Sequence, residues 1–207
     1  MTTFYKVARL VLGNIVKLGF RRNNIGLENV PEKGGFILCC NHTHFMDVAF
    51  LVIAVKNHQI NFMAKQELFK NKLCGWFFKK MGAFPIVRGS ASAGEGINKA
   101  EGILREGSVL GIFPEGTRSK TGEMGRLKPG SLLIALKSGV PLIPAYITPK
   151  GGKIKAFKGL GVRFGEPIDA KSLFEGADLD DIKRSDYRAA DEKLRSIMLS
   201  LRMEEMQ

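Results

Sequence analysis

The sequence predicts an α/β fold, a single domain whose mixed, largely parallel central sheet is flanked by helices, with an amphipathic helix added at the N-terminus. Three observations support this prediction. The 207 residues are 44% hydrophobic, which is enough for one substantial core. No linker or internal repeat divides them. Short apolar runs of strand length alternate with longer stretches of helical periodicity, as in parallel sheets covered by helices.

Residues 4–20 predict a helix with one apolar face. Its apolar residues recur at steps of three and four, namely Phe4, Val7, Ala8, Val11, Ile15 and Leu18, and the opposite arc holds Lys6, Arg9, Gly13 and Lys17. The segment spans only about 25 Å as a helix and carries basic side chains, so we expect it to lie in a membrane interface rather than cross a bilayer. A helix packed on the protein's own core is the alternative. A secretory signal fits less well, because charge interrupts the apolar stretch.

The remaining elements follow the alternation along the chain. Strands are predicted at 36–40, 60–64, 83–87, 108–113, 141–147 and 161–165. Helices are predicted at 46–55, 67–80, 91–106, 129–138 and 184–202. Within the second helix, residues 73–80 combine aromatic side chains with lysines, a pattern that fits lipid contact, an acyl tunnel or a helix packed on the core. The helices at 91–106 and 184–202 carry no evident chemistry.

The first polar cluster comes where the strand at 36–40 ends. His42 is expected in the loop that leaves this strand, and Asp47 in the first turn of the next helix, where a carboxylate is electrostatically favoured. A fold-back of the loop would let Asp47 accept a hydrogen bond from one imidazole nitrogen and leave the other nitrogen basic. His42 is then a general base for an attacking hydroxyl. The chain shows no Gly-x-Ser-x-Gly element and no cysteine in a nucleophile pattern, which disfavours a covalent acyl-enzyme.

Two other interpretations of this cluster remain open. Asn41, His42 and Asp47 are common capping or loop residues and could only cap the following helix. His42, His44 and Asp47 could instead bind a metal ion, although no further ligand cluster accompanies them.

The second polar cluster, Pro114 to Ser119, follows the strand at 108–113. Ligands of open α/β sheets gather at such strand ends. Gly116 permits close backbone approach, Thr117 supplies a hydroxyl, and Arg118 offers a planar fork that can hold two phosphate oxygens. Glu115 is expected to position this loop or an acceptor hydroxyl. Taken alone, Pro-Glu-Gly-Thr is also an ordinary turn.

With these clusters the chain resembles the glycerolipid acyltransferases, the family typified by 1-acylglycerol-3-phosphate (lysophosphatidic acid) acyltransferase. Four blocks match in order over roughly residues 24–167. They are Asn41 to Asp47 (the His-x4-Asp block), Gly82 to Gly89, Pro114 to Ser119, and Val140 to Ala145. Lys128-Pro129-Gly130, before the fourth block, also looks familial.

The resemblance implies a role for each matched residue. His42 would be the general base and Asp47 its orienting partner, while the acceptor's glycerol phosphate would be recognised by Arg88, Glu115, Gly116, Thr117 and Arg118. An acyl-CoA or acyl carrier protein thioester would be the co-substrate, with no cofactor and no metal. The family commonly has serine at position 44 and an acidic residue at position 87, where this chain has His44 and Val87, so the acceptor could differ from the commonest one.

Charge and cysteine usage indicate the surroundings. The net charge is +12, and residues 1–168 carry 25 basic and 10 acidic side chains, whereas residues 169–207 carry 7 and 10. The positive field would attract an anionic membrane surface and phosphate-bearing substrates. No nucleic-acid pattern emerges, so nucleic acid is not an expected partner. Cys39, Cys40 and Cys74 are expected to be buried apolar residues in a reducing compartment, with Cys39 and Cys40 on opposite faces of a strand.

We therefore expect residues 1–22 to be a membrane-interface helix and residues 23–207 an acyltransferase domain, located at the cytoplasmic face of the membrane as a peripheral or monotopic protein. The expected reaction moves a fatty acyl group to the free hydroxyl of lysophosphatidic acid and gives phosphatidic acid in phospholipid biosynthesis. Alternatives are the same chemistry on another lysophospholipid or acyl acceptor, a hydrolase, and a non-catalytic module that binds anionic lipid or nucleic acid.

Overall fold

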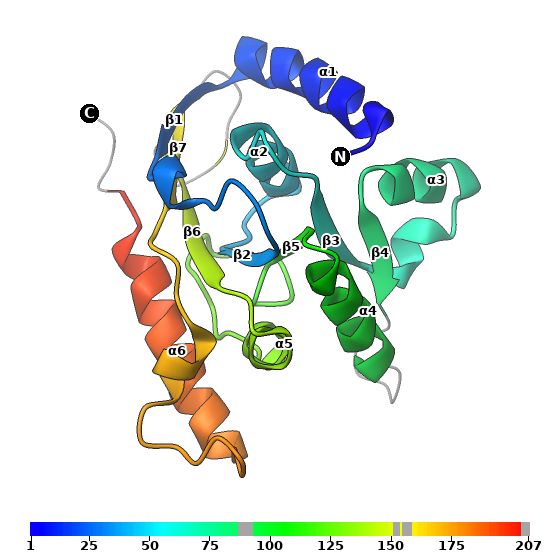
Figure 1. The fold of residues 1–207 in the computed structure, drawn as a ribbon. Coiled ribbons are helices and arrows are strands. Elements are labelled where there is room, and N and C mark those ends of the chain that lie inside the picture. The colour runs from blue at the N-terminus through cyan, green and yellow to red at the C-terminus, as the bar shows by residue number, and fades with distance from the viewer. Residues whose placement is uncertain (87–92, 151–153, 155–158, 204–207) are drawn as a thin grey trace.

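The structure, a computed structural model, describes residues 1–86, 93–150, 154 and 159–203. Within these residues a seven-stranded sheet is surrounded by six α-helices (Figure 1). The helices are α1 (Thr3–Gly19), α2 (Asp47–Ala54), α3 (Lys72–Lys80), α4 (Ala93–Arg105), α5 (Gly130–Ser138) and α6 (Arg184–Ser200). The strands are β1 (Arg21–Ile25), β2 (Phe36–Cys40), β3 (Ile60–Lys65), β4 (Ala83–Ile86), β5 (Val109–Ile112), β6 (Leu142–Pro149) and β7 (Gly159–Phe164). Three short 3₁₀ helices are η1 (Leu27–Asn29), η2 (Gln66–Phe69) and η3 (Ala170–Phe174).

The sheet is mixed and largely parallel, as the sequence predicts. Its strand order is β1-β7-β6-β2-β5-β3-β4. Every neighbouring pair is parallel except β6 and β7, which run antiparallel. β2 and β5 lie side by side near the middle, with Cys39 opposite Ile112. Because parallel strands end at the same edge of a sheet, the loop after β2 and the loop after β5 emerge next to each other.

Helices cover both faces of the sheet, so each face has its own hydrophobic cluster. On one face, α1 and α2 pack on alternate strand residues such as Leu38 and Cys40. On the other face, α4, α5 and α6 pack on the intervening residues, such as Ile37 and Cys39. The fully buried, apolar β2 suits a central strand covered on both sides.

Most predicted elements are confirmed with ends shifted by one or two residues, but the helix expected at 67–80 is confirmed only from residue 72 onward. The chain there forms η2, a turn, and then α3. Asn71 starts α3, since its side-chain oxygen accepts the N–H groups of Leu73 and Cys74 at 3.0 and 3.1 Å. An asparagine side chain competes with the helical backbone in this way and favours a cap over a helix interior. The end of the strand expected at 83–87 and the start of the helix expected at 91–106 lie outside the described residues.

Two further outcomes concern β1 and the cysteines. The sequence did not predict β1, a polar strand at the sheet edge that pairs only with β7 among the described strands. Cys39 and Cys40 are buried on opposite faces of the sheet, as expected. The expectation for Cys74 is wrong, because this residue is exposed on α3.

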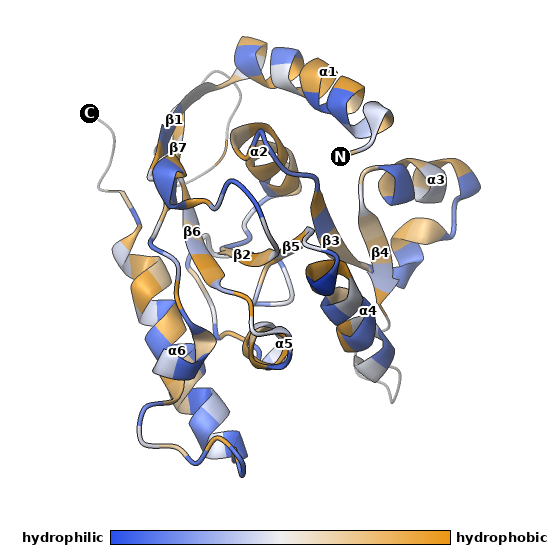
Figure 2. Ribbon diagram, in the orientation of Figure 1, coloured by the Kyte–Doolittle hydropathy of each residue, from blue (hydrophilic) through white to orange (hydrophobic). Residues whose placement is uncertain are grey.

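Helix α1 is attached to the body by one face and exposes the other. Tyr5, Gly13 and Val16 are buried, and the Tyr5 hydroxyl accepts the N–H of Ile60 at 3.1 Å. Five of its other apolar residues are exposed, namely Val7, Leu10, Val11, Ile15 and Leu18, and Figure 2 shows apolar residues on the part of α1 that faces away from α2. No helix among the described residues combines the length and apolar composition needed to cross a bilayer.

Candidate active site

His42 and Asp47 form a hydrogen-bonded pair at the end of β2. The Nδ1 of His42 lies 2.9 Å from the Oδ2 of Asp47. The Asp47 side chain is fully buried and, as a carboxylate, can only accept, so Nδ1 carries the proton and Nε2 is left free to take one. The imidazole is 18% exposed and stacks on Phe113, with ring centroids 4.0 Å apart. The ring is therefore fixed in one tautomer and one orientation while one edge stays accessible.

Asp47 also organises the loop that carries His42. Its Oδ2 accepts the backbone N–H groups of Thr43 and His44 at 2.7 and 2.8 Å. Three donors thus converge on one oxygen at the start of α2, where a negative charge is electrostatically favoured. The short spacing of the His-x4-Asp segment thus folds the loop around the Asp47 side chain.

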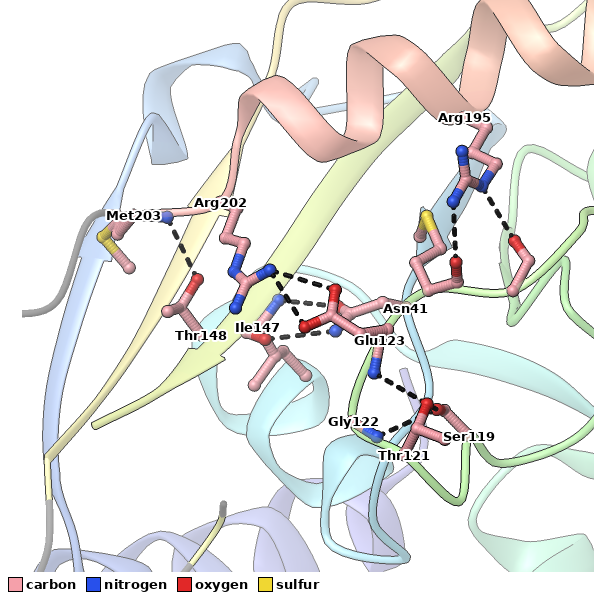
Figure 3. Close-up of polar contacts among 12 residues, drawn as sticks. Asn41, Ser119, Thr121, Gly122, Glu123, Ile147, Thr148, Arg195, Arg202 and Met203 are labelled. Carbon is pink, nitrogen blue, oxygen red and sulfur yellow. Dashed lines mark hydrogen bonds and ion pairs between the residues drawn. The ribbon is translucent and has the colours of Figure 1, made fainter. Parts of the chain in front are cut away.

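Asn41 anchors the same loop to the sheet. It is buried, its amide donates to the carbonyl of Ile147 at 3.1 Å, and its oxygen accepts the N–H of Ile147 at 2.7 Å (Figure 3). The amide thus pairs with β6 as another backbone unit would. The interpretation that these residues only cap α2 is wrong, because Met46 is the N-cap and makes no side-chain cap bond.

His44 turns toward its own loop. Its Nδ1 accepts the N–H of Met46 at 3.2 Å, and its ring lies against Phe45. The imidazole nitrogen therefore serves as an acceptor within the loop. Across the described part of the chain, no group of three or more His, Cys, Asp or Glu side chains is arranged to hold a metal ion.

The turn after β5 is bonded to the His42 loop on two sides. The backbone N–H of Ser119 donates to the carbonyl of His42 at 2.7 Å. The Oε1 of Glu115 accepts the N–H of His42 at 2.9 Å. Both backbone groups of the proposed base are thus held by the Pro114 to Ser119 turn, so the sequence-predicted clusters form one site.

Glu115 is buried and bridges two loops. While Oε1 takes the N–H of His42, Oε2 accepts the N–H of Gly125 at 2.9 Å. The sequence analysis expected Glu115 to position the loop or to contact an acceptor hydroxyl. Its hydrogen bonds to His42 and Gly125 support the first of these roles. Its expected contact with the acceptor stays a prediction.

Gly116, within the turn, lies against the side chain of Lys128. Gly116 has φ +72°, a left-handed backbone that favours glycine. A Cβ at this position would stand 3.0 Å from the Cδ, Cε and Nζ atoms of Lys128, whose backbone N–H donates to the carbonyl of Pro114. Sequence reasoning noted Lys128 only as part of a familial element, and the structure adds its ammonium group to the site.

Thr117 and Arg118 are exposed at the tip of the turn. Among the described residues, their backbone N–H groups and side chains make no hydrogen bond, so they can reach a ligand. Arg88, which the sequence assigns to acceptor binding, lies outside the described residues, as does Val87.

The hydrogen bonds of the two loops limit which backbone N–H groups are free to stabilise an oxyanion. The N–H groups of His42, Thr43 and His44 all donate to carboxylates. That loop therefore cannot stabilise a developing oxyanion through them. The N–H groups of Thr117 and Arg118 are the better placed candidates.

The buried cysteines beside the site are poor nucleophiles. Burial raises the pKa of the Cys39 thiol to about 12, and burial raises the pKa of Cys40 well above its ordinary value, with the negative charge of Asp47 acting in the same direction. Because the thiolate is the reactive form, neither cysteine supports a covalent acyl-enzyme.

Comparison with known proteins agrees with this geometry. Residues 21–148 match the family model for acyltransferases, and this range includes both loops. The chain belongs to the acyltransferase family.

Two relatives and one solved structure are informative. The 1-acyl-sn-glycerol-3-phosphate acyltransferase of Bacillus subtilis is 41% identical over 143 residues, 68% of this chain and 70% of that protein. A chloroplastic enzyme of the same description from Brassica napus is 32% identical over 128 residues, and this alignment spans 61% of the chain and only 37% of the relative. The crystal structure of a Thermotoga maritima 1-acyl-sn-glycerophosphate acyltransferase, PlsC, superposes with a TM-score of 0.67 at 23% identity, covering 97% of this chain and 82% of that one. It shows that the fold is shared.

Proposed function

We propose that this protein is a 1-acyl-sn-glycerol-3-phosphate acyltransferase, which transfers a fatty acyl group from a thioester donor to lysophosphatidic acid and gives phosphatidic acid. One observation supports the proposal most strongly. The His42–Asp47 pair is bonded directly to an exposed turn that carries Thr117 and Arg118, which joins a base to an anion-binding element. The names of the curated relatives agree with this substrate class.

In the proposed mechanism, the acceptor is a lipid with a free hydroxyl and a phosphate. The Nε2 of His42 takes the hydroxyl proton as the oxygen attacks the thioester carbonyl carbon, and the C–O bond forms. The tetrahedral intermediate then collapses, the C–S bond breaks, and the thiolate takes the proton from the imidazolium. Asp47 stabilises that imidazolium throughout through Nδ1. A thiol has a pKa near 8.5, so one histidine suffices for both proton transfers.

The acceptor phosphate would be held by the turn after β5. The Arg118 guanidinium can donate two parallel hydrogen bonds to phosphate oxygens, and the Lys128 ammonium lies against Gly116 of the same turn. Glu115 positions this turn and also the backbone of His42. Arg88 would complete the phosphate site. Acyl-CoA or acyl carrier protein serves as the donor, and the chemistry uses no cofactor.

The protein would work at an anionic membrane surface, on the cytoplasmic side. The exposed apolar residues of α1 continue into those of α3, which are Leu73, Trp76 and Phe77. Phe4 links the two helices by edge contacts with the Trp76 and Phe77 rings, at centroid distances of 5.3 and 6.1 Å. We call the exposed apolar residues of both helices the α1–α3 surface. Both helices also carry exposed lysines, which suit anionic headgroups.

A direct assay tests the proposed function. Purified protein is incubated with lysophosphatidate and either acyl-CoA or acyl carrier protein thioester, and phosphatidate and free fatty acid are quantified separately. We expect phosphatidate from the wild type, and a rate at least about 10²-fold lower for His42→Ala with the circular dichroism spectrum retained. His58→Gln is the matched control, since His58 hydrogen-bonds the carbonyl of Pro31 and lies against the Phe36 ring, away from the site. Free fatty acid as the main product would establish a hydrolase instead.

A further inference from the structure

Helix α6 lies outside the part of the chain that matches the family model, yet it contacts the loop behind Glu115. Arg195, on α6, donates from Nε to the carbonyl of Gly125 at 3.0 Å and from Nη2 to the carbonyl of Met124 at 2.9 Å (Figure 3). One planar guanidinium thus donates hydrogen bonds to two successive carbonyls. A fork of this kind fixes the direction of both carbonyls, which a point charge cannot do.

The peptide unit between Met124 and Gly125 connects the Arg195 hydrogen bonds to the proposed active site. Its carbonyl oxygen accepts from Arg195, and its N–H donates to the Oε2 of Glu115 at 2.9 Å. The C=O and N–H of a trans peptide point in opposite directions within one rigid plane. A rotation of the plane would break both hydrogen bonds together, so the guanidinium on one side sets the direction of the N–H on the other.

The loop has little else to hold that plane in place. Gly122 has φ +90°, and Gly125 is exposed. The N–H groups of Gly122 and Glu123 make only local bonds, to the side chains of Ser119 and Thr121 (Figure 3). Arg202 adds an ion pair with Glu123 at 3.1 Å, but half or more of each side chain is exposed, which makes this pair weak. The loop is anchored further along by the buried Leu127 side chain and by the Lys128 N–H bond to Pro114, so at the 124–125 peptide itself the buried side chain of Met124 and the guanidinium of Arg195 are the restraints.

We propose that Arg195 is a positioning residue for acyl transfer, acting through the 124–125 peptide unit and Glu115 on the backbone of His42. The inference rests on the proposed function for its kinetic readout. The positive charge near the Met124 carbonyl also polarises the peptide and strengthens the N–H bond to Glu115. When the guanidinium is removed, Glu115 loses a fixed donor and its other oxygen no longer holds the His42 N–H in one geometry.

Kinetics of three variants test the proposal. Arg195→Ala should lower kcat by about 10-fold with a smaller change in the acceptor KM, because the base is displaced and the phosphate site is kept. The kcat of Arg195→Lys should lie between those of the wild type and Arg195→Ala, because an ammonium can hold one of the two carbonyls. Arg195→Lys also serves as the test variant if Arg195→Ala does not fold. Lys193→Ala is the matched control, because Lys193 lies on the same helix but pairs with Glu175 away from the loop. Equal activity of Arg195→Ala and the control would overturn the proposal.

A double-mutant cycle with Glu115→Gln separates positioning from general stabilisation. If the coupling runs through Glu115, Arg195→Ala should cost little further activity in the Glu115→Gln background. Losses that simply multiply would show that Arg195 acts by another route.

Hydrogen exchange gives a readout that does not depend on activity. In Arg195→Ala, the peptide segment that contains His42 should exchange its amide hydrogens at least about 10-fold faster than in Lys193→Ala, because its bond to Glu115 opens more often. Unchanged exchange would count against the proposal even in an active enzyme. A wild type that forms no phosphatidate, but shows this difference in exchange, would contradict the proposed function and leave the positioning role standing.

Discussion

A single oxygen of Asp47 lies 2.9 Å from the Nδ1 of His42 and also accepts the N–H groups of Thr43 and His44. The carboxylate that orients the proposed base is therefore the same group that shapes its loop. The proposed orientation of His42 and the fold of its loop both depend on this one carboxylate, so its replacement by the neutral isostere asparagine should disturb both.

Asp47→Asn should lower kcat for phosphatidate formation by at least about 10²-fold. The amide has one acceptor oxygen and no charge, so it stabilises the imidazolium less and can favour the wrong tautomer of His42. Steady-state kinetics at saturating substrates measure this effect. A thermal unfolding scan accompanies them, because the loss of charge-assisted bonds to Thr43 and His44 also costs stability. A kcat within about threefold of the wild type would refute the orienting role.

Arg118→Lys should raise the acceptor KM by about 10-fold and leave kcat nearly unchanged. Lysine keeps the charge but loses the planar fork that binds two phosphate oxygens. The effect should shrink when the acceptor is a monoacylglycerol, which has no phosphate. Arg188→Lys, on the exposed face of α6, is the matched control. If the acceptor KM of Arg118→Lys equals that of the control, Arg118 does not bind the phosphate.

The central part of the fold and both halves of the site could be predicted from sequence because their signals are local. β2 and β5 are continuous apolar runs, and each ends in a polar cluster with a distinctive spacing. That two parallel neighbours bring these clusters together is a rule of sheet geometry. The hydrogen bond between His42 and Asp47 followed from their spacing.

Other features depend on contacts between distant segments and left no local signal. β1 is polar and owes its conformation to pairing with β7, more than 130 residues later. The break before α3 needs Asn71 to use its side chain as a cap. The contact of Arg195 with Gly125 joins residues 70 positions apart, and nothing in the periodicity of α6 marks one arginine among several.

The α1–α3 surface should be required for vesicle binding. Leu18 is 82% exposed, so Leu18→Glu should cost little stability. It should nevertheless weaken binding to vesicles that contain anionic lipid by about 10-fold, because a carboxylate replaces an apolar contact and is repelled by the headgroups. Leu179→Glu is the matched control, since Leu179 is an exposed leucine outside both helices. Co-sedimentation with vesicles measures the binding of both variants. Equal binding of Leu18→Glu and Leu179→Glu would reject α1 as an anchor.

The last prediction concerns Asp191, a carboxylate of α6 on the opposite face of the sheet from α2. Burial raises the pKa of Asp191 from 3.8 to about 6, with the charge of Glu192 acting in the same direction. One of its oxygens and the hydroxyl of Ser131 are buried without a hydrogen-bond partner within the described structure. The folded state binds this proton more tightly than the unfolded state, so the stabilisation is fully present below pH 3.8 and is lost as the pH rises through about 6.

Asp191→Asn should therefore stabilise the protein at pH 8 by about 1–2 kcal/mol, less than the full value of the pKa shift because solvent screens part of the charge. At pH 4 the wild type is largely protonated at this site, and the two proteins should unfold at nearly the same denaturant concentration. Urea unfolding at pH 4, 6 and 8 measures the difference. Asp186→Asn provides the contrast, because the Asp186 carboxylate caps α6 and its loss should destabilise the helix at pH 8. A gap between Asp191→Asn and the wild type that stayed constant across this pH range would show that the carboxylate does not titrate as its burial requires.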